Sequence, residues 1–277
     1  MKLEKPAPVS TRASIAPLLF LGLCLLAGRE LPRAQESQAL PPPGAPAQAN
    51  ESAAKSHALS FEERADIFMA RKSFEDAVDY YYRALKEVHF SSGVMWNKLG
   101  IAYQQLQNFH SARKAYSQAI HQQKTYAEPW NNLGTTYFMQ GKYGRSVKYY
   151  LRALKLNPNS ASYHLNLGTS YFHMKKYNES VDEYRTALSL DPDVFAERSA
   201  FGTTIEARGA DPEYYFYLAK VFASLGRVDE AVRNLRRALE DGFKDQKRIL
   251  NDPDFKKISQ NPAYVELMNN PPVGIKD

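Results

Sequence analysis

The residues that could do chemistry lie scattered along this chain of 277 residues. None of the six histidines has a metal-ligand partner at helical spacing, and the single cysteine, Cys24, lies near the N-terminus. The sequence contains no Gly-x-Ser-x-Gly elbow, phosphate-binding loop, dinucleotide fingerprint or His-Glu-x-x-His pair. We interpret His164 as a packed residue of a helix. We therefore expect no enzyme activity, no catalytic residue, no metal and no cofactor.

The elements that would position polar residues repeat along the chain, and Ala127 to Pro158 holds one complete unit. Its first half carries an apolar stripe with the spacing of an amphipathic helix: Trp130, Leu133, Gly134 and Tyr137. Its second half carries another: Ser146, Tyr150 and Ala153. Gly141 between them is a predicted helix stop, because glycine tolerates the left-handed conformation. We expect two helices that cross where Gly134 and Ser146 are small.

The pattern recurs 34 residues earlier and 34 residues later. The earlier unit has Trp96, Leu99, Gly100, Tyr103, Ala112, Tyr116 and Ala119; the later one has His164, Leu167, Gly168, Tyr171, Ser180, Tyr184, Ala187 and Pro192. This period and residue set resemble the tetratricopeptide repeat (TPR) family. The resemblance implies an all-α fold, a right-handed TPR α-solenoid of about five helix-turn-helix repeats with a C-terminal helical cap. It covers residues 58–243.

The resemblance also implies a concave groove lined by first-helix positions around the Leu-Gly pair. Ten residues form this predicted peptide-binding groove: Asn97, Lys98, Gln104, Asn131, Asn132, Thr135, Phe138, Asn166, Thr169 and Phe172. A wider set adds Ile101, Gln105, Met139, Leu165 and His173.

Within the groove, two asparagines and an apolar patch are singled out. Asn132 and Asn166 occupy the position whose asparagine contacts peptide backbone in some TPR proteins, although packing is an equal explanation for this residue type. Phe138, Met139 and Phe172 suggest an apolar patch beside these amides that would receive a hydrophobic anchor. The Lys/Asn/Arg set of the TPR carboxylate clamp is not matched, so a chaperone C-terminus is not predicted.

Residues 1–34 have the pattern of a secretory signal peptide. Three basic residues precede the apolar run Ile15 to Ala27, which is shorter than the roughly 20 residues of a membrane span. An uncleaved N-terminal anchor is the alternative, and lipid attachment at Cys24 is less favoured because Leu23 is not small. Residues 35–57 are rich in Pro and Ala and predict a disordered linker.

The formal net charge of +6 divides into +3 for residues 1–34 and +3 for the remainder. We interpret the remainder as nearly balanced and predict no nucleic-acid partner.

The ends of the repeat region depart from the regular period. Ser60 and Glu63 predict a capping box that starts the first helix. An insert of 17 residues, 195–211, breaks the period and predicts an irregular excursion such as a hairpin; a variable loop or an atypical helix that pads the stack is the alternative. Residues 244–277 predict a helical cap and tail, with helix starts at Asp252-Pro253 and Asn261-Pro262.

These features predict a scaffold or adaptor of the cell envelope, exported to the periplasm or secreted. It would bind a partner protein or peptide through the groove, and membrane association would come through the N-terminus alone. The alternative is an assembly factor for an envelope or secretion complex, anchored in the inner membrane. An enzyme with a site in the 195–211 insert and carbohydrate binding by exposed tyrosines are less favoured. The oligomeric state is not predicted.

Overall fold

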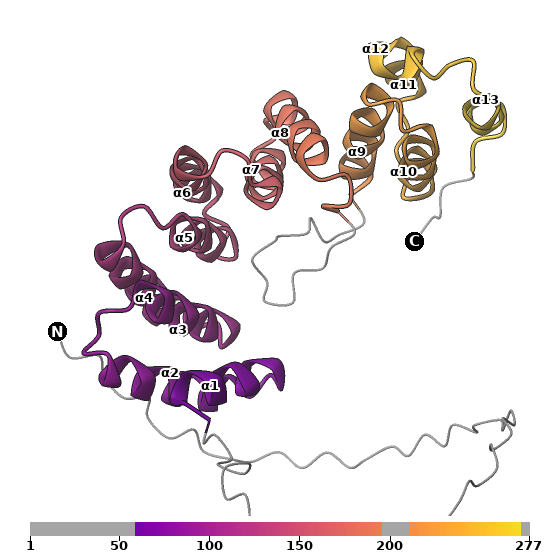
Figure 1. Ribbon diagram of the computed structural model, residues 1–277. Coiled ribbons are helices and arrows are strands. Elements are labelled where there is room, and N and C mark those ends of the chain that lie inside the picture. Colours follow the sequence, from indigo (N-terminus) through magenta and orange to yellow (C-terminus); the bar gives the residue numbers. More distant parts are fainter. Residues whose placement is uncertain (1–58, 196–210, 273–277) are drawn as a thin grey trace, which may run out of the picture. The chain divides into compact units, whose positions relative to one another are not determined.

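The computed structural model describes residues 59–195 and 211–272, and these ranges contain thirteen helices and no strand (Figure 1). Ten of the helices form five successive hairpins. We name the first helix of each hairpin its A helix: α1 (Phe61–Ala70), α3 (Gly93–Gln105), α5 (Glu128–Phe138), α7 (Ala161–His173) and α9 (Pro212–Ser224). The second is its B helix: α2 (Phe74–Glu87), α4 (Phe109–Gln122), α6 (Tyr143–Leu156), α8 (Tyr177–Leu190) and α10 (Val228–Glu240). Three short helices follow: α11 (Gln246–Asn251), α12 (Pro253–Lys256) and α13 (Pro262–Asn269).

Each hairpin packs against the next one along the chain. The two helices of a hairpin contact each other, and each B helix also contacts the following A helix. The A helices α3, α5 and α7 touch in turn. This is the α-solenoid that the sequence predicts. The predicted signal peptide, the linker, the interior of the insert (196–210) and the end of the tail lie outside the described residues.

A glycine and a tyrosine fix the crossing of the A and B helices in the three central hairpins. The pairs are Gly100 with Tyr116, Gly134 with Tyr150, and Gly168 with Tyr184. A Cβ atom on Gly134 would lie 2.5 Å from Cε1 of Tyr150, so only glycine fits there. Ser146 is fully buried on α6, and its place at the crossing stays a prediction. Its Oγ lies 2.9 Å from Ser170 Oγ of the next hairpin.

The turn inside each hairpin places one residue in the left-handed region. These residues are Lys72 (φ 59°), Gln107 (φ 56°), Gly141 (φ 70°), Lys175 (φ 60°) and Gly226 (φ 71°). The helix stop predicted at Gly141 is confirmed, since α5 ends at Phe138. Three of the five hairpins make the same turn without glycine, at the cost of some backbone strain.

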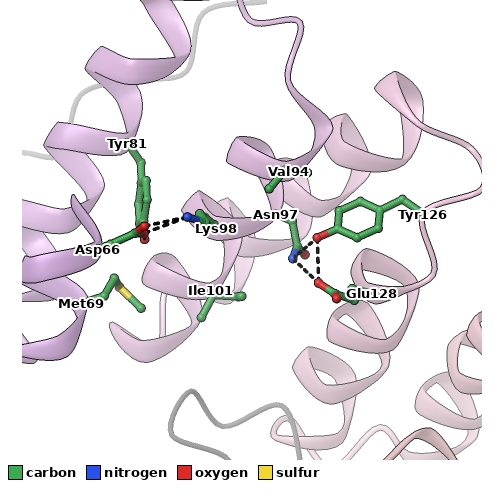
Figure 2. A pocket seen from close by; sticks show the side chains of 9 residues that line it. All are labelled: Asp66, Met69, Tyr81, Val94, Asn97, Lys98, Ile101, Tyr126 and Glu128. Atoms are coloured by element: carbon green, nitrogen blue, oxygen red, sulfur yellow. Dashed lines mark hydrogen bonds and ion pairs between the residues drawn. The ribbon is translucent and has the colours of Figure 1, made fainter. Parts of the chain in front are cut away.

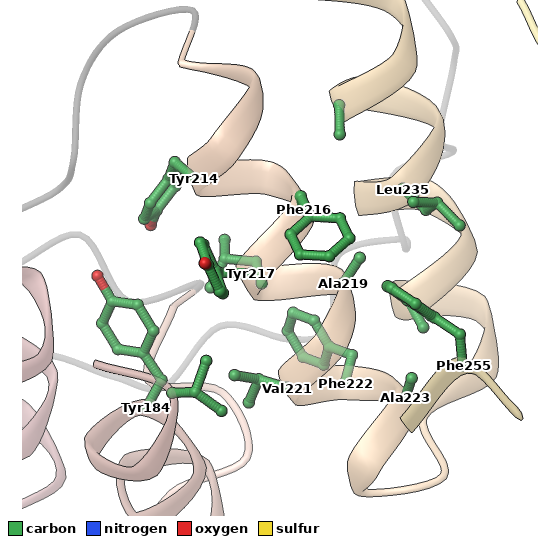
Figure 3. Close-up of a cluster of buried hydrophobic side chains, with 14 of the residues drawn as sticks. Tyr184, Tyr214, Phe216, Tyr217, Ala219, Val221, Phe222, Ala223, Leu235 and Phe255 are labelled. Carbon is green, nitrogen blue, oxygen red and sulfur yellow. The ribbon is translucent and has the colours of Figure 1, made fainter. Parts of the chain in front are cut away.

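The last hairpin is covered by the C-terminal helices (Figure 3). α12 packs on α9, and α13 packs on α10. Phe255 is 1% exposed and lies 5.7 Å from Phe216, centroid to centroid. The predicted helix starts are confirmed, because Asp252 and Asn261 each accept a backbone hydrogen bond at the first turn of α12 and α13. The capping box of Ser60 and Glu63 is also present.

None of the helices in the described ranges combines the length and the apolar character that crossing a membrane requires.

Candidate functional site

Most residues of the predicted groove are buried. Eight of the ten are at most 5% exposed: Asn97, Gln104, Asn131, Asn132, Thr135, Asn166, Thr169 and Phe172. Lys98 and Phe138 are half-buried. In this structure the eight buried side chains contact other parts of the chain, and their role in binding a peptide stays a prediction.

The four asparagines form a ladder of hydrogen bonds between hairpins. Asn132 Nδ2 donates to Asn97 Oδ1 over 3.0 Å, and Asn166 Nδ2 donates to Asn131 Oδ1 over 3.0 Å. Asn131 Nδ2 donates to Asn132 Oδ1 over 3.3 Å. Because these amides are buried and join successive hairpins, their arrangement favours packing, one of the two explanations that the sequence leaves open.

Three polar residues of the predicted groove accept hydrogen bonds from buried tyrosine hydroxyls: Thr135, Thr169 and Gln104. Tyr150 Oη donates to Thr135 Oγ1 over 3.2 Å, and Tyr184 Oη donates to Thr169 Oγ1 over 3.1 Å. Tyr116 Oη donates to Gln104 Oε1 over 3.1 Å. Burial raises the pKa of all three tyrosines above its usual value. These hydrogen bonds satisfy the hydroxyls that the crossing tyrosines carry into the core.

Other aromatic side chains cover Phe172 of the predicted apolar patch. The rings of Tyr177, Tyr214 and Tyr217 surround Phe172 at centroid distances of 5.4 to 6.4 Å. Phe172 is 5% exposed, because the next hairpin covers it. Phe138 packs edge-on against Tyr143 and His173, and Met139 is 48% exposed.

A pocket of about 500 Å³ lies where the first three hairpins meet (Figure 2). Its lining comes mainly from A helices: Asp66 and Met69 of α1, Tyr81 of α2, Val94, Asn97, Lys98 and Ile101 of α3, Tyr126, and Glu128 of α5. Met69, Val94 and Ile101 supply apolar surface, and Val94 is 44% exposed. We name this site the A-helix pocket.

One end of the A-helix pocket carries an ion-pair cluster around Lys98. Its Nζ lies 2.9 Å from Glu62 Oε1 and 2.8 Å from Asp66 Oδ2. Tyr81 Oη donates to Asp66 Oδ1 over 2.5 Å. Partial burial opposes the charge on Lys98, but the hydrogen bonds that it donates to Asp66 and Glu62 outweigh this effect and raise the pKa of Lys98. Lys98 is therefore charged near neutral pH, and the cluster has two carboxyl groups for its one ammonium group.

The other end of the pocket carries the carboxylate of Glu128. Tyr126 Oη donates to Glu128 Oε2 over 2.7 Å, and Asn97 Nδ2 donates to the same oxygen over 3.4 Å. Burial, followed by this bond to Glu128, raises the pKa of Tyr126. Within the described ranges no Lys or Arg forms an ion pair with Glu128. The pocket thus has an acidic group at each end and an apolar wall between them.

The groove predicted from the sequence includes some residues of this pocket and lacks others. Asn97, Lys98 and Ile101 belong to the predicted set and line it. Asp66 belongs to the first repeat and is not among the predicted groove residues. A signal was available, since Asp66 lies 15 residues before Tyr81, as Thr135 does before Tyr150. Tyr126 and Glu128 lie in and just after a connection whose path the repeat pattern does not predict.

His164 is packed, as the sequence suggests. Its Nδ1 lies 2.6 Å from Glu183 Oε2, and its Nε2 lies 2.9 Å from the carbonyl oxygen of Pro158. Over the described part of the chain, no three His, Cys, Asp or Glu side chains come together as a metal site.

Comparison with protein-family models matches four consecutive segments, each described as a tetratricopeptide repeat: residues 94–124, 127–160, 161–194 and 198–245. Together they span more than half of the chain. A search of the curated proteins gives no match.

Among solved structures, a crystal structure of MamA is 22% identical and covers 64% of this chain and 93% of its own, with a TM-score of 0.45. MamA from Desulfovibrio magneticus RS-1 is 14% identical, with coverages of 69% and 96% and a TM-score of 0.47. YrrB, described as a TPR protein with an unusual peptide-binding site, is 16% identical, with coverages of 69% and 88% and a TM-score of 0.44.

The four matched repeats coincide with hairpins that share one turn conformation, and three of these hairpins share the glycine–tyrosine crossing. On this evidence the chain belongs to the tetratricopeptide-repeat family.

Proposed function

We propose that this chain is a non-enzymatic scaffold that binds a peptide segment of a partner protein in the A-helix pocket. The segment carries an apolar side chain next to Lys or Arg. The observation that supports this most directly is the exposed Val94 between two acidic groups, the Glu62–Asp66–Lys98 cluster and Glu128. The apolar side chain would cover Val94 and Ile101, and the cation would pair with Glu128.

The family supports the coarser part of this proposal. Tetratricopeptide repeats generally serve as non-catalytic modules for protein interaction, and stacked hairpins present continuous surfaces for that purpose. The lining adds chemistry that favours a cationic ligand, since its carboxylates outnumber its single ammonium group.

Export is part of the same proposal. The basic residues before the apolar run Ile15 to Ala27 support a signal peptide and a place in the cell envelope or outside the cell. Mass spectrometry of the N-terminus of the protein recovered from cells tests it. A first residue near Gln35 supports export with cleavage, whereas an intact Met1 or Lys2 supports the anchored assembly factor.

Peptide selection on the full chain tests the pocket. We expect a random display library to be enriched in peptides that place Leu, Ile or Phe beside Lys or Arg. Binding of the best peptide should weaken about ten-fold in Glu128→Gln and in Val94→Lys, since each removes about one charge pair or apolar contact.

The matched control is Glu87→Gln, which removes one negative charge from an exposed position on α2 outside the pocket. Its peptide affinity should equal that of the wild type. Enrichment of acidic peptides, or equal binding by all variants, would contradict the proposed site.

A further inference from the structure

The positive charge of the chain is concentrated in its central repeats. Residues 88–178 contain eleven Lys and Arg but one carboxylate, Glu128, which lies in the A-helix pocket. These residues therefore carry +10, and the rest of the chain carries −4. The nearly balanced charge inferred for residues after position 34 hides this separation.

Four of the basic side chains form a row along helix α6. Arg145, Lys148, Arg152 and Lys155 are spaced i, i+3, i+7 and i+10, and all four are exposed. The row spans about 15 Å at 1.5 Å per residue. No ion pair joins any of them to another residue of the described ranges. Helix α6 itself contains no carboxylate.

Aromatic rings hold the guanidinium groups of this surface in place. Arg113 and Arg145 each lie 5.6 Å from the centroid of Tyr137, and Arg152 lies 5.5 Å from that of Trp130. The ring of Tyr149 stacks on Tyr137 at 5.1 Å with an interplanar angle of 7°. Rings that fix arginine side chains before binding reduce the entropy that binding would cost.

A pocket of about 950 Å³ lies beside the basic row. Its lining includes Trp130, Val147, Leu151 and Leu154, and Leu151 is 42% exposed. Glu183 also lines it, but this carboxylate is 2.6 Å from His164 Nδ1. We name the row and this pocket together the basic B-helix face. It combines an apolar hollow with four cations that form no ion pair with the described residues.

We propose that the basic B-helix face binds an acidic amphipathic helix of a partner protein. The four cations are spaced so that they can pair with carboxylates along one edge of such a helix. Leu151 and the apolar pocket beside it can bury the apolar stripe of the same helix. A single-stranded nucleic acid fits less well, because Tyr137 and Tyr149 cover each other and arginines cover Tyr137 and Trp130. Bases would find few free ring faces on which to stack.

Fluorescence anisotropy with the full chain tests this binding. The probe is a labelled peptide of roughly 18 residues, long enough to form a helix, with Glu at i, i+3, i+7 and i+10 beside a Leu stripe. The variant is Arg145→Gln/Lys148→Gln/Arg152→Gln/Lys155→Gln. We expect its affinity to fall about ten-fold or more, since four exposed ion pairs are lost. Leu151→Ser should weaken binding about three-fold through lost apolar contact.

The matched control is Arg233→Gln/Arg236→Gln/Lys244→Gln/Lys247→Gln. It removes the same four charges from exposed positions on and after α10. Its affinity should stay within about two-fold of the wild type, and the Glu-to-Gln version of the peptide should not bind. Circular dichroism confirms that each variant keeps its helices.

Three results would overturn the proposal. One is the absence of peptide binding by the wild-type chain, and another is an equal loss in both quadruple variants. The third is tighter binding of a single-stranded oligonucleotide of the same length, which would make the face a nucleic-acid surface. None of these results bears on the A-helix pocket, because Glu128→Gln and Val94→Lys test that site separately.

Discussion

At Gly134, helix α5 packs directly against the ring of Tyr150 from helix α6. A methyl group there would lie 2.5 Å from Tyr150, whose ring is fully buried and cannot move aside. We expect Gly134→Ala to lower the free energy of unfolding by about 1–3 kcal/mol, as overpacking a core does. Urea unfolding followed by circular dichroism measures this.

Gly144→Ala is the matched control for Gly134→Ala. Nothing lies within 4 Å of a Cβ atom at Gly144, which is near the start of α6. Alanine there should leave stability unchanged or raise it by up to about 1 kcal/mol. Equal destabilisation by the two substitutions would show that backbone propensity, and not the contact with Tyr150, decides the effect.

Asn132 links two hairpins through its side-chain amide. Replacing it by alanine leaves Asn97 Oδ1 without the donor at 3.0 Å and Asn131 Nδ2 without its acceptor. Because both atoms are buried, we expect Asn132→Ala to cost about 1–3 kcal/mol of unfolding free energy. Asn159→Ala, at an exposed position, should change stability by less than about 0.5 kcal/mol. A stable Asn132→Ala variant that loses peptide binding would instead assign this amide to a ligand.

The sequence identifies such residues more readily than it identifies what they contact. The repeat spacing selects Asn132 and Asn166 as special positions. It does not reveal that Asn97 and Asn131 accept their hydrogen bonds, because an amide serves a neighbouring hairpin and a ligand equally well. The burial of Phe172 depends on Tyr214 and Tyr217, which follow the irregular insert in the chain. The period alone cannot place them.

The turns between A and B helices differ in backbone strain, because some place glycine and others place lysine or glutamine in the left-handed region. Lys175 holds φ at 60°, a conformation that costs a residue with a Cβ atom about 1 kcal/mol. We expect Lys175→Gly to raise the free energy of unfolding by about 0.5–1 kcal/mol and Gly141→Ala to lower it by a similar amount. Thermal and urea unfolding measure both. Destabilisation by Lys175→Gly would mean that the lysine side chain supports the turn.

The C-terminal helices depend on one arginine of α11. Arg248 lies 4.4 Å from the Phe216 centroid and 5.0 Å from that of Tyr217, and its Nη1 lies 2.9 Å from Glu213 Oε2. We expect Arg248→Ala to destabilise the docking of α11–α13 by about 2 kcal/mol. Hydrogen exchange should accelerate in α11–α13 and stay unchanged in α1–α4. Lys247→Ala, at the exposed neighbouring position, should leave exchange as in the wild type.

Local chemistry explains which elements the sequence predicts. α12 and α13 begin at Asx-Pro pairs, and α1 begins at a Ser-x-x-Glu box, so each start is visible in a few residues. α11 was missed because its capping residue, Asp245, is followed by no proline and its helix is six residues long. Its position rests on Arg248, which contacts Glu213 across 35 residues of sequence, and no local pattern predicts such a contact.

For the whole molecule, the separation of charge has a cost in stability. The +10 of residues 88–178 lies on neighbouring helices, where like charges repel, and no carboxylate of the described residues forms an ion pair with the row on α6. A protein under selection for stability alone gains nothing from such a row. The row on α6 therefore supports the proposal of an acidic partner. Its cost in stability can be measured on the free protein, without any ligand.

Removing the row should stabilise the free protein. We expect Arg145→Gln/Lys148→Gln/Arg152→Gln/Lys155→Gln to have a higher Tm than the wild type at about 20 mM salt. The difference should shrink at about 300 mM salt, where the Debye length falls to roughly 6 Å and screens the repulsion. The variant Arg233→Gln/Arg236→Gln/Lys244→Gln/Lys247→Gln should show no such gain, since carboxylates surround its sites on and after α10. A lower Tm for the α6 variant at both salt concentrations would show that the row supports the fold, which removes the reason to infer a partner from charge.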